Sequence, residues 1–334
     1  MPGRSAVVSD TGRRRRRNED QYFCDPPLFA VADGMGGAQA GEVASGLAAA
    51  VLNEAAPDGG AAEHGEERVA ALIQEANRRV FQRSSEDAST SGMGTTMTVA
   101  LVEGDTIAFG HVGDSRAYRV RGGELEQLTD DHSLVGELVR SGRLSPEEAE
   151  SHPQRSVITR ALGTEPDVDV DTFTVQAEPD DVYLICSDGL TDMVPPRELE
   201  ALLLERTGDL DAAARALVDA ANAGGGEDNI TVVLFQIAGA GDADATKQMP
   251  AAPEPEAELE ADDEDTLSGL DAVPAVDTAV ISAAEFEEQR AQLQSEAEPA
   301  PAPATSPRRR LAPLILLVLL LTAIAVLAVW GLTR

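Results

Sequence analysis

The chain of 334 residues contains 26 basic and 59 acidic side chains, and its formal net charge at pH 7 is −33. Its apolar fraction of 43% excludes a wholly disordered polypeptide and allows at least one domain with a buried core. A surface this acidic repels phosphate groups, so no nucleic acid is expected as a partner beyond what a small basic patch could hold.

Residues 1–238 are predicted to fold, because runs with strand and helix periodicity fill them. The strand-like runs are Leu28–Ala32, Thr95–Val102, Thr106–Val112, Ala117–Arg121, Val182–Cys186 and Ile230–Ile237. The helical runs are Gly41–Ala55, Glu66–Arg83, Ser133–Ser141, Arg197–Arg206 and Leu210–Ala223. Helices come in pairs between clusters of strands, which favours an α+β layered domain over a doubly wound parallel sheet. Gly122-Gly123 predicts a tight hairpin turn between Ala117–Arg121 and Glu124–Leu128.

Residues 239–307 have a different composition, rich in alanine, proline and acidic residues. Such a segment buries too little apolar surface to offset its ordering entropy. It is therefore predicted to be an extended linker whose charges repel one another. An acidic docking segment for a basic partner is the functional alternative.

Residues 308–334 are predicted to be a membrane anchor. The run Leu311–Leu332 carries no charged residue, and about 20 apolar residues suffice to cross a bilayer. Arg308-Arg309-Arg310 precedes the run, and Trp330 lies where an interfacial aromatic is expected. The positive-inside rule places the arginines, and everything before them, in the cytoplasm. We therefore expect a single-pass protein of the cell membrane with a cytoplasmic catalytic domain.

The cysteines and the N-terminus agree with a cytoplasmic setting. Cys24 and Cys186 cannot build a disulfide framework, and no Cys-x-x-Cys spacing indicates structural zinc. The N-terminal residues carry the basic run Arg13–Arg17 but no apolar core typical of a signal peptide.

Aspartates recur where strand-like runs end beside a small or turn-forming residue. Four such places are Val31-Ala32-Asp33-Gly34, Val112-Gly113-Asp114-Ser115, Cys186-Ser187-Asp188-Gly189 and Glu227-Asp228-Asn229. A fifth acidic stretch, Asn18-Glu19-Asp20, precedes an aromatic run. One Asp-Gly pair usually marks a turn, but carboxylates gathered at several strand ends are the hard oxygen ligands that Mg²⁺ and Mn²⁺ prefer. The pattern therefore indicates a candidate metal site.

A series of motifs in order along residues 5–238 resembles the metal-dependent protein phosphatases, the type 2C serine/threonine class, in its bacterial form. The motifs are Arg13–Asp20, Ala32-Asp33-Gly34-Met35-Gly36-Gly37, Ser91-Gly92-Met93-Gly94-Thr95-Thr96, Val112–Arg116, Leu128–Ser133, His152-Pro153-Gln154-Arg155, Ile158–Gly163, Cys186–Leu190 and Asp228–Thr231. The resemblance implies a four-layer α-β-β-α sandwich of two antiparallel sheets flanked by helices.

The same resemblance implies a binuclear Mn²⁺ or Mg²⁺ centre and assigns residues to it. Asp33 would bridge the two ions and the Gly34 carbonyl would join one of them, while Asp188 and Asp228 would complete the other. Glu19 and Asp20 would bind an ion or its water, and Asp114 with Asp188 would hold a third, weaker position. Arg15 matches the arginine that binds the substrate phosphate, and a water activated between the metals would attack phosphorus.

Other features bear on this hypothesis. The position after Asp33-Gly34 carries Met35, where the animal members have a histidine that is credited with protonating the leaving group. The general acid is therefore open between His132, His152 and metal-bound water. A cysteine-based phosphatase would need an arginine six positions after its cysteine, and neither Cys24 nor Cys186 has one. The run Asp167–Asp171 is interpreted as one solvated face of a strand rather than an aspartyl-phosphate motif.

The function predicted from the sequence is a membrane-anchored protein serine/threonine phosphatase that opposes bacterial Ser/Thr protein kinases. Its partners would be phosphorylated proteins, including the kinases and their targets. A catalytically silent phosphoprotein-binding scaffold on the same fold is the alternative. That alternative predicts the loss of one or more metal aspartates, and the sequence retains them all.

Overall fold

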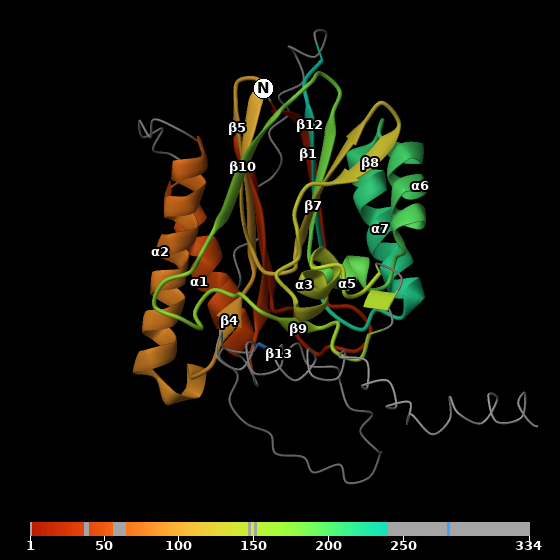
Figure 1. The fold of residues 1–334 in the computed structure, drawn as a ribbon. Coiled ribbons are helices and arrows are strands. Elements are labelled where there is room, and N and C mark those ends of the chain that lie inside the picture. Colours follow the sequence, from red (N-terminus) through yellow and green to blue (C-terminus); the bar gives the residue numbers. More distant parts are fainter. Residues whose placement is uncertain are drawn as a thin grey trace, which may run out of the picture. The chain divides into compact units, whose positions relative to one another are not determined.

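Two antiparallel β-sheets lie face to face, with helices against their outer faces (Figure 1). The computed structural model describes residues 2–36, 40–55, 65–145, 148–149, 152–239 and 279–280. All of these residues belong to a unit that spans Met1–Phe286.

The first sheet contains both the earliest and the latest strand of residues 1–238. Its order is β1 (Pro2–Asp10), β12 (Ile230–Ile237), β11 (Val182–Cys186), β7 (Arg116–Arg121) and β8 (Glu124–Gln127). The hairpin between β7 and β8 turns at Gly122 and Gly123, whose φ angles are +61° and +87°. The predicted glycine turn is thus confirmed, because positive φ angles favour glycine.

The second sheet carries the Asp33 motif near its edge. Its order is β10 (Asp171–Gln176), β6 (Thr106–Val112), β5 (Met97–Glu103), β3 (Leu28–Met35) and β2 (Asp20–Asp25), and β4 (Gly94–Thr95) pairs with the end of β3. Neighbouring strands are antiparallel throughout.

The inner faces of the sheets form an aromatic and aliphatic core. Phe29 of β3 stacks on Phe235 of β12 with ring centroids 4.1 Å apart, and Tyr183 of β11 lies 5.1 Å from Phe235. Every residue of β12 is buried, because its other face is covered by a helix. This explains why the strand is a continuous apolar run rather than an alternating one.

Helices cover each outer face in pairs, as the sequence predicts. The second sheet packs against α1 (Ala40–Ala55) and α2 (Gly65–Glu86), and the first sheet against α6 (Pro196–Arg206) and α7 (Leu210–Gly224). Asp209 caps α7, because its carboxylate accepts a hydrogen bond from the Ala212 amide at 3.0 Å. The four-layer α-β-β-α architecture is therefore confirmed.

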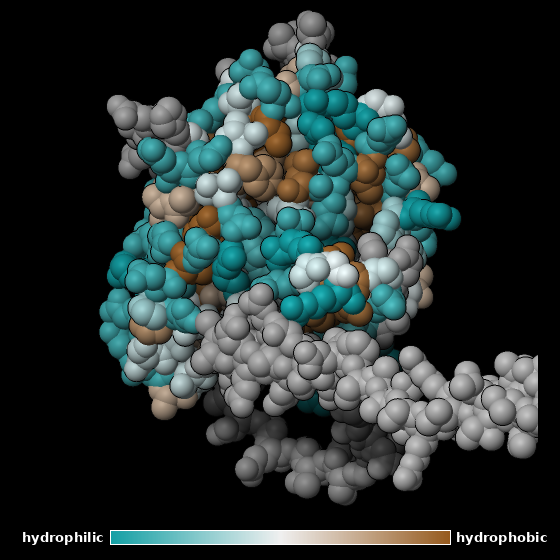
Figure 2. Space-filling model, in the orientation of Figure 1, coloured by the Kyte–Doolittle hydropathy of each residue, from teal (hydrophilic) through white to brown (hydrophobic). Residues whose placement is uncertain are grey.

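Short elements gather at one end of the sandwich (Figure 1). They are η1 (Ala88–Thr90), α3 (Leu134–Arg140), β9 (Val157–Ile158), α5 (Asp188–Thr191) and β13 (Ala279–Val280). Ser133 caps α3 through the Gly136 amide. In Figure 2, the coloured part of the visible face is mainly hydrophilic and is interrupted by hydrophobic patches.

Some sequence interpretations differ from the structure. The edge strands β1 and β2 were not predicted, because β1 buries only Ala6 fully and β2 begins with acidic Asp20. The interpretation of Asp167–Asp171 as a strand face is wrong, since β10 begins only at Asp171. Asp171 is also more than a solvated residue, because it binds His132 and Arg160.

The predicted linker and anchor lie almost entirely outside the described residues. Among the helices that are described, none is both long and apolar enough to cross a bilayer. The division into residues 1–238, 239–307 and 308–334 stays a prediction.

Candidate metal centre

Five separate segments deliver aspartates to one end of the sandwich. Asp20 and Asp33 are register partners across the β2–β3 pair. Asp114 follows β6, Asp188 begins α5 one residue after the end of β11, and Asp228 precedes β12. The antiparallel topology thus brings together residues that are far apart in the sequence.

The surroundings of Asp33 place these carboxylates within electrostatic reach of one another. Burial raises the pKa of Asp33 well above its ordinary value, and neighbouring negative charges raise it further. The charges responsible belong to Asp20, Asp188, Asp228 and Asp114. The predicted set of aspartates therefore forms one electrostatic cluster.

Asp188 and Asp114 belong to the same cluster as Asp33. Burial, followed by the charges of Asp114 and Asp228, raises the pKa of Asp188 well above its usual range. Burial and the charges of Asp131 and Asp192 raise the pKa of Asp114 to about 7. Carboxylates held this close repel each other in their charged forms, and a bound cation would remove that repulsion.

The donor set fits a hard divalent cation. Asp20, Asp114 and Asp188 each have a buried Oδ1 atom without a hydrogen-bond partner in the described part of the chain. Unpaired buried carboxylate oxygens are costly unless something positive approaches them. Within the described residues, no three histidine, cysteine or acidic side chains lie close enough together to enclose an ion.

Asp20 is held from the neighbouring sheet. The Ser187 hydroxyl donates a hydrogen bond to Asp20 Oδ2 at 2.8 Å, and it accepts one from the Thr231 amide at 3.0 Å. Burial raises the pKa of Asp20 to about 6. Because Ser187 directly precedes Asp188, this contact links the two sheets beside Asp20 and Asp188.

Gly34 has a packing reason in addition to its predicted role as a ligand. A Cβ atom at this position would lie 2.2 Å from the Gly41 carbonyl oxygen and 2.6 Å from that of Glu19. The Gly34 amide also donates to the Glu19 carbonyl at 3.2 Å. Gly34 therefore lets the first turn of α1 approach β3, and this brings Glu19 beside the aspartates.

Arg15 lies at the same centre. Its guanidinium donates to Asp228 Oδ2 at 2.7 Å, and about a quarter of each side chain is exposed. Asp33 and Glu19 are near enough to add to the attraction that raises the pKa of Arg15, although burial opposes it. A permanently positive group thus borders the carboxylate cluster and keeps contact with solvent.

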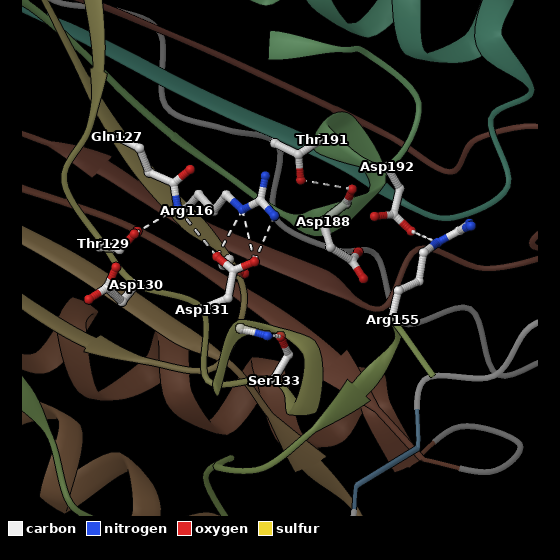
Figure 3. A network of polar contacts seen from close by, with 12 residues as sticks. Arg116, Gln127, Thr129, Asp130, Asp131, Ser133, Arg155, Asp188, Thr191 and Asp192 are labelled. Atoms are coloured by element: carbon white, nitrogen blue, oxygen red, sulfur yellow. Dashed lines mark hydrogen bonds and ion pairs between the residues drawn. The ribbon is translucent and has the colours of Figure 1, made fainter. Parts of the chain in front are cut away.

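A cavity of about 530 Å³ opens beside Asp114 and Asp188. Its walls come from the end of β8, from α3, from the segment before β9, and from α5 and the residues after it. Figure 3 shows the polar contacts of several lining residues, among them Arg116, Asp131, Arg155 and Asp192. A cavity that begins at the acidic cluster is the natural place for the chain that flanks a reacting group.

Two ion pairs in this cavity were missed by the sequence reasoning. Arg116 binds Asp131 through two nitrogens, the shortest contact being 2.6 Å, and Arg155 Nε lies 3.6 Å from Asp192 Oδ2 (Figure 3). Arg116, Asp131 and Arg155 lie within the phosphatase-like motifs, but the sequence analysis predicts no role for them. Asp192 follows Asp188 by one helical turn, and this spacing could have predicted that the two side chains lie close together.

The histidines considered as proton donors do not line the cavity. His132 is buried, accepts from the Gly113 amide at 3.1 Å and lies 3.1 Å from Asp171. Burial and the positive charge of Arg160 lower the pKa of His132 to about 3, so the ring is neutral. His132 therefore has a structural role. Within the described residues, His152 accepts a local bond from the Gln154 amide.

Comparisons with known proteins agree with this geometry. The family model Protein phosphatase 2C matches residues 13–221. The serine/threonine phosphatase stp of Listeria monocytogenes is 42% identical over 236 residues, which are 68% of this chain and 93% of that protein. The serine/threonine protein phosphatase PstP of Mycobacterium tuberculosis is 42% identical over 238 residues, which are 70% of this chain and 45% of that protein.

Solved structures resemble the fold as well. The crystal structure of Mycobacterium tuberculosis PstP/Ppp superposes with a TM-score of 0.68 and 39% identity, covering 72% of this chain and 100% of that one. The catalytic domain of PstP in complex with two manganese ions superposes with a TM-score of 0.66 and 37% identity, covering 71% and 99%. The chain therefore belongs to the protein phosphatase 2C family.

Proposed function

We propose that this protein is a metal-dependent protein serine/threonine phosphatase, which removes phosphate from phosphoserine and phosphothreonine of other proteins. The convergence of Asp20, Asp33, Asp114, Asp188 and Asp228 on one electrostatic cluster carries this proposal. Family membership and the two manganese ions of the PstP structure support the same chemistry.

The chain's own residues divide the work of binding. Asp33, Asp20, Asp188, Asp228 and the Gly34 carbonyl would hold the two ions, and Glu19 would support them. Asp114 with Asp188 would hold a third, weaker ion. When bound, Mn²⁺ or Mg²⁺ supplies Lewis acidity and lowers the pKa of a water that acts as the nucleophile.

Arg15 binds the substrate phosphate in this proposal. A guanidinium fits two phosphoryl oxygens, and its partner Asp228 fixes it next to the cluster. The exposed part of Arg15 leaves room for an incoming oxyanion. The cavity beside Asp114 accepts residues that flank the phosphorylated side chain.

Hydrolysis of a phosphothreonine peptide and of p-nitrophenyl phosphate tests the function. The purified full chain is expected to turn over both substrates with Mn²⁺ and to lose activity when EDTA removes the metal. Restoration by added Mn²⁺ is expected, since the ligands are protein carboxylates. Absence of metal-dependent turnover under all these conditions would favour the scaffold alternative.

Replacement of Arg15 by alanine is expected to raise KM about 10-fold or more and to change kcat less, because a charged contact to the phosphate is lost. Steady-state kinetics with p-nitrophenyl phosphate measure both constants. The matched control is Arg14→Ala, in the same basic run. An equal effect of both substitutions would contradict a specific role for Arg15.

We further propose, from the sequence, that residues 308–334 anchor the phosphatase to the cell membrane near Ser/Thr kinases and their targets. The full chain is expected to stay in the membrane fraction after an alkaline wash, and a chain ending at Pro307 is expected to be released. Release of both chains would contradict the anchor.

A further inference from the structure

A two-residue strand from the predicted linker pairs with the catalytic domain. Ala279 and Val280 of β13 run parallel to Val157 and Ile158 of β9, with Ala279 opposite Val157 and Val280 opposite Ile158. This contact joins residues more than a hundred positions apart (Figure 1). The residues directly before β9, Arg155 and Ser156, line the cavity beside Asp114 and Asp188.

The sequence of the linker marks the same place. Between residues 239 and 307, valine occurs only at Val273, Val276 and Val280, and isoleucine only at Ile281. β-Branched residues favour strands, whereas the alanine, proline and acidic residues that dominate the rest of this segment do not. The composition therefore singles out one part of the linker as able to add a strand.

β9 connects this strand with the site. On its other side, Ile158 forms an antiparallel bridge with Ser133, which caps α3. The Ile158 side chain is 1% exposed and packs with Ala161 and Met35, and Met35 is next to Gly34. Arg155 and Ser156, which immediately precede β9, form part of the cavity wall.

The two ends of the β9 segment differ in how firmly they are held. On the C-terminal side, the Thr159 amide donates to the His132 carbonyl at 2.8 Å, and Leu162 bridges Thr95. On the N-terminal side, outside the pairing with β13, the backbone bond described for the Val157 amide is a local one, to the Gln154 carbonyl at 3.3 Å. The Arg155–Asp192 ion pair is partly exposed and therefore contributes little to holding this segment in place. Pairing with β13 supports the less firmly held side.

We propose that residues 279–280 form an intramolecular docking strand, which binds the open edge of β9 and holds the Arg155–Ser156 wall of the cavity in place. The main chain supplies the affinity, as in other cases where a peptide adds a strand to an exposed edge. Residues 279–280 thereby support the surface that receives a protein substrate. The effect on substrates rests on the proposed function, whereas the docking itself does not.

Cross-linking tests the docking independently of activity. Parallel register partners lie about 5 Å apart, within the range that a disulfide spans. The full chain with Val157→Cys and Ala279→Cys, in a Cys24→Ser background, is oxidised with glutathione disulfide and mapped by mass spectrometry. An intramolecular 157–279 bond is expected, with at least about fivefold less cross-linking in the control pair Val157→Cys with Ala272→Cys. Equal cross-linking in both pairs, or only dimers, would overturn the docking.

Steady-state kinetics test the effect of this docking on substrate binding. Proline lacks the amide hydrogen that a ladder needs, so Ala279→Pro with Val280→Pro removes the pairing whichever amide faces β9. The KM for a phosphothreonine peptide is expected to rise about 3- to 10-fold, with kcat for p-nitrophenyl phosphate within twofold. The control Ala272→Pro with Val273→Pro changes the same dipeptide and is expected to match wild type. An unchanged or lowered peptide KM at 279–280, or the same increase in the control, would overturn the proposal.

Discussion

Replacement of Asp33 by asparagine is expected to lower kcat/KM by at least about 10³-fold and, at the same time, to stabilise the metal-free protein. Asp33 is the carboxylate that faces the four other aspartates of the cluster. An amide keeps the shape of the side chain but removes its charge. The loss of activity follows from the loss of a central ligand, and the gain in stability follows from reduced repulsion.

The sign of the stability effect comes from the raised pKa of Asp33. An acid whose pKa is higher in the folded state binds its proton more tightly there, so the folded state is favoured at low pH. Metal-free wild type should therefore lose stability as pH rises above about 4, and Asp33→Asn should lose less. At pH 7.5 the metal-free variant should therefore be more stable than the metal-free wild type.

Urea unfolding in EDTA and steady-state kinetics in Mn²⁺ measure the two effects. Asp25→Asn is the matched control, because Asp25 is exposed at the far end of β2. It should change neither quantity appreciably. Near-normal turnover by Asp33→Asn would mean that the catalytic metals lie elsewhere.

Replacement of Asp188 by asparagine is expected to lower kcat/KM at least about 10²-fold, whereas Asp114→Asn should cost no more than about 10-fold. Asp188 interacts with both Asp33 and Asp114, and so contributes to the central pair and to the third position. Asp114 lines the cavity, and its charge is the last of those that raise the pKa of Asp33.

Mn²⁺ titrations of activity distinguish these variants. Asp188→Asn should need more Mn²⁺ and still fall short of wild-type turnover, while Asp114→Asn should approach it at high Mn²⁺. Asp219→Asn serves as control, since Asp219 is exposed on α7. Equal losses for Asp188 and Asp114 would contradict the division into a central pair and a weaker third position.

Much of the fold could be predicted because its central strands are buried on both faces. Thr106–Val112, Val182–Cys186 and Ile230–Ile237 are predicted with the bounds that the structure has. The edge strand β1 could not be recognised, because its partly exposed residues show no clear apolar alternation. Its place beside β12 depends on pairing across most of the domain, which local periodicity does not encode.

The aspartates of the site could be predicted from their positions at strand ends, but their arrangement could not. The register that places Asp20 opposite Asp33 and the link from Ser187 to Asp20 are properties of the folded sheets. The burial of His132 was also beyond the sequence, since its neighbours Asp171 and Arg160 come from later segments. A polar residue in a motif can thus be structural, and only its contacts reveal this.

The most direct measurement is anomalous scattering from crystals of the protein grown with Mn²⁺. Two strong peaks are predicted between Asp33, Asp188 and Asp228, with a weaker third peak beside Asp114. Manganese bound only outside this cluster, or no ordered manganese in an active preparation, would contradict a metal centre built from these carboxylates.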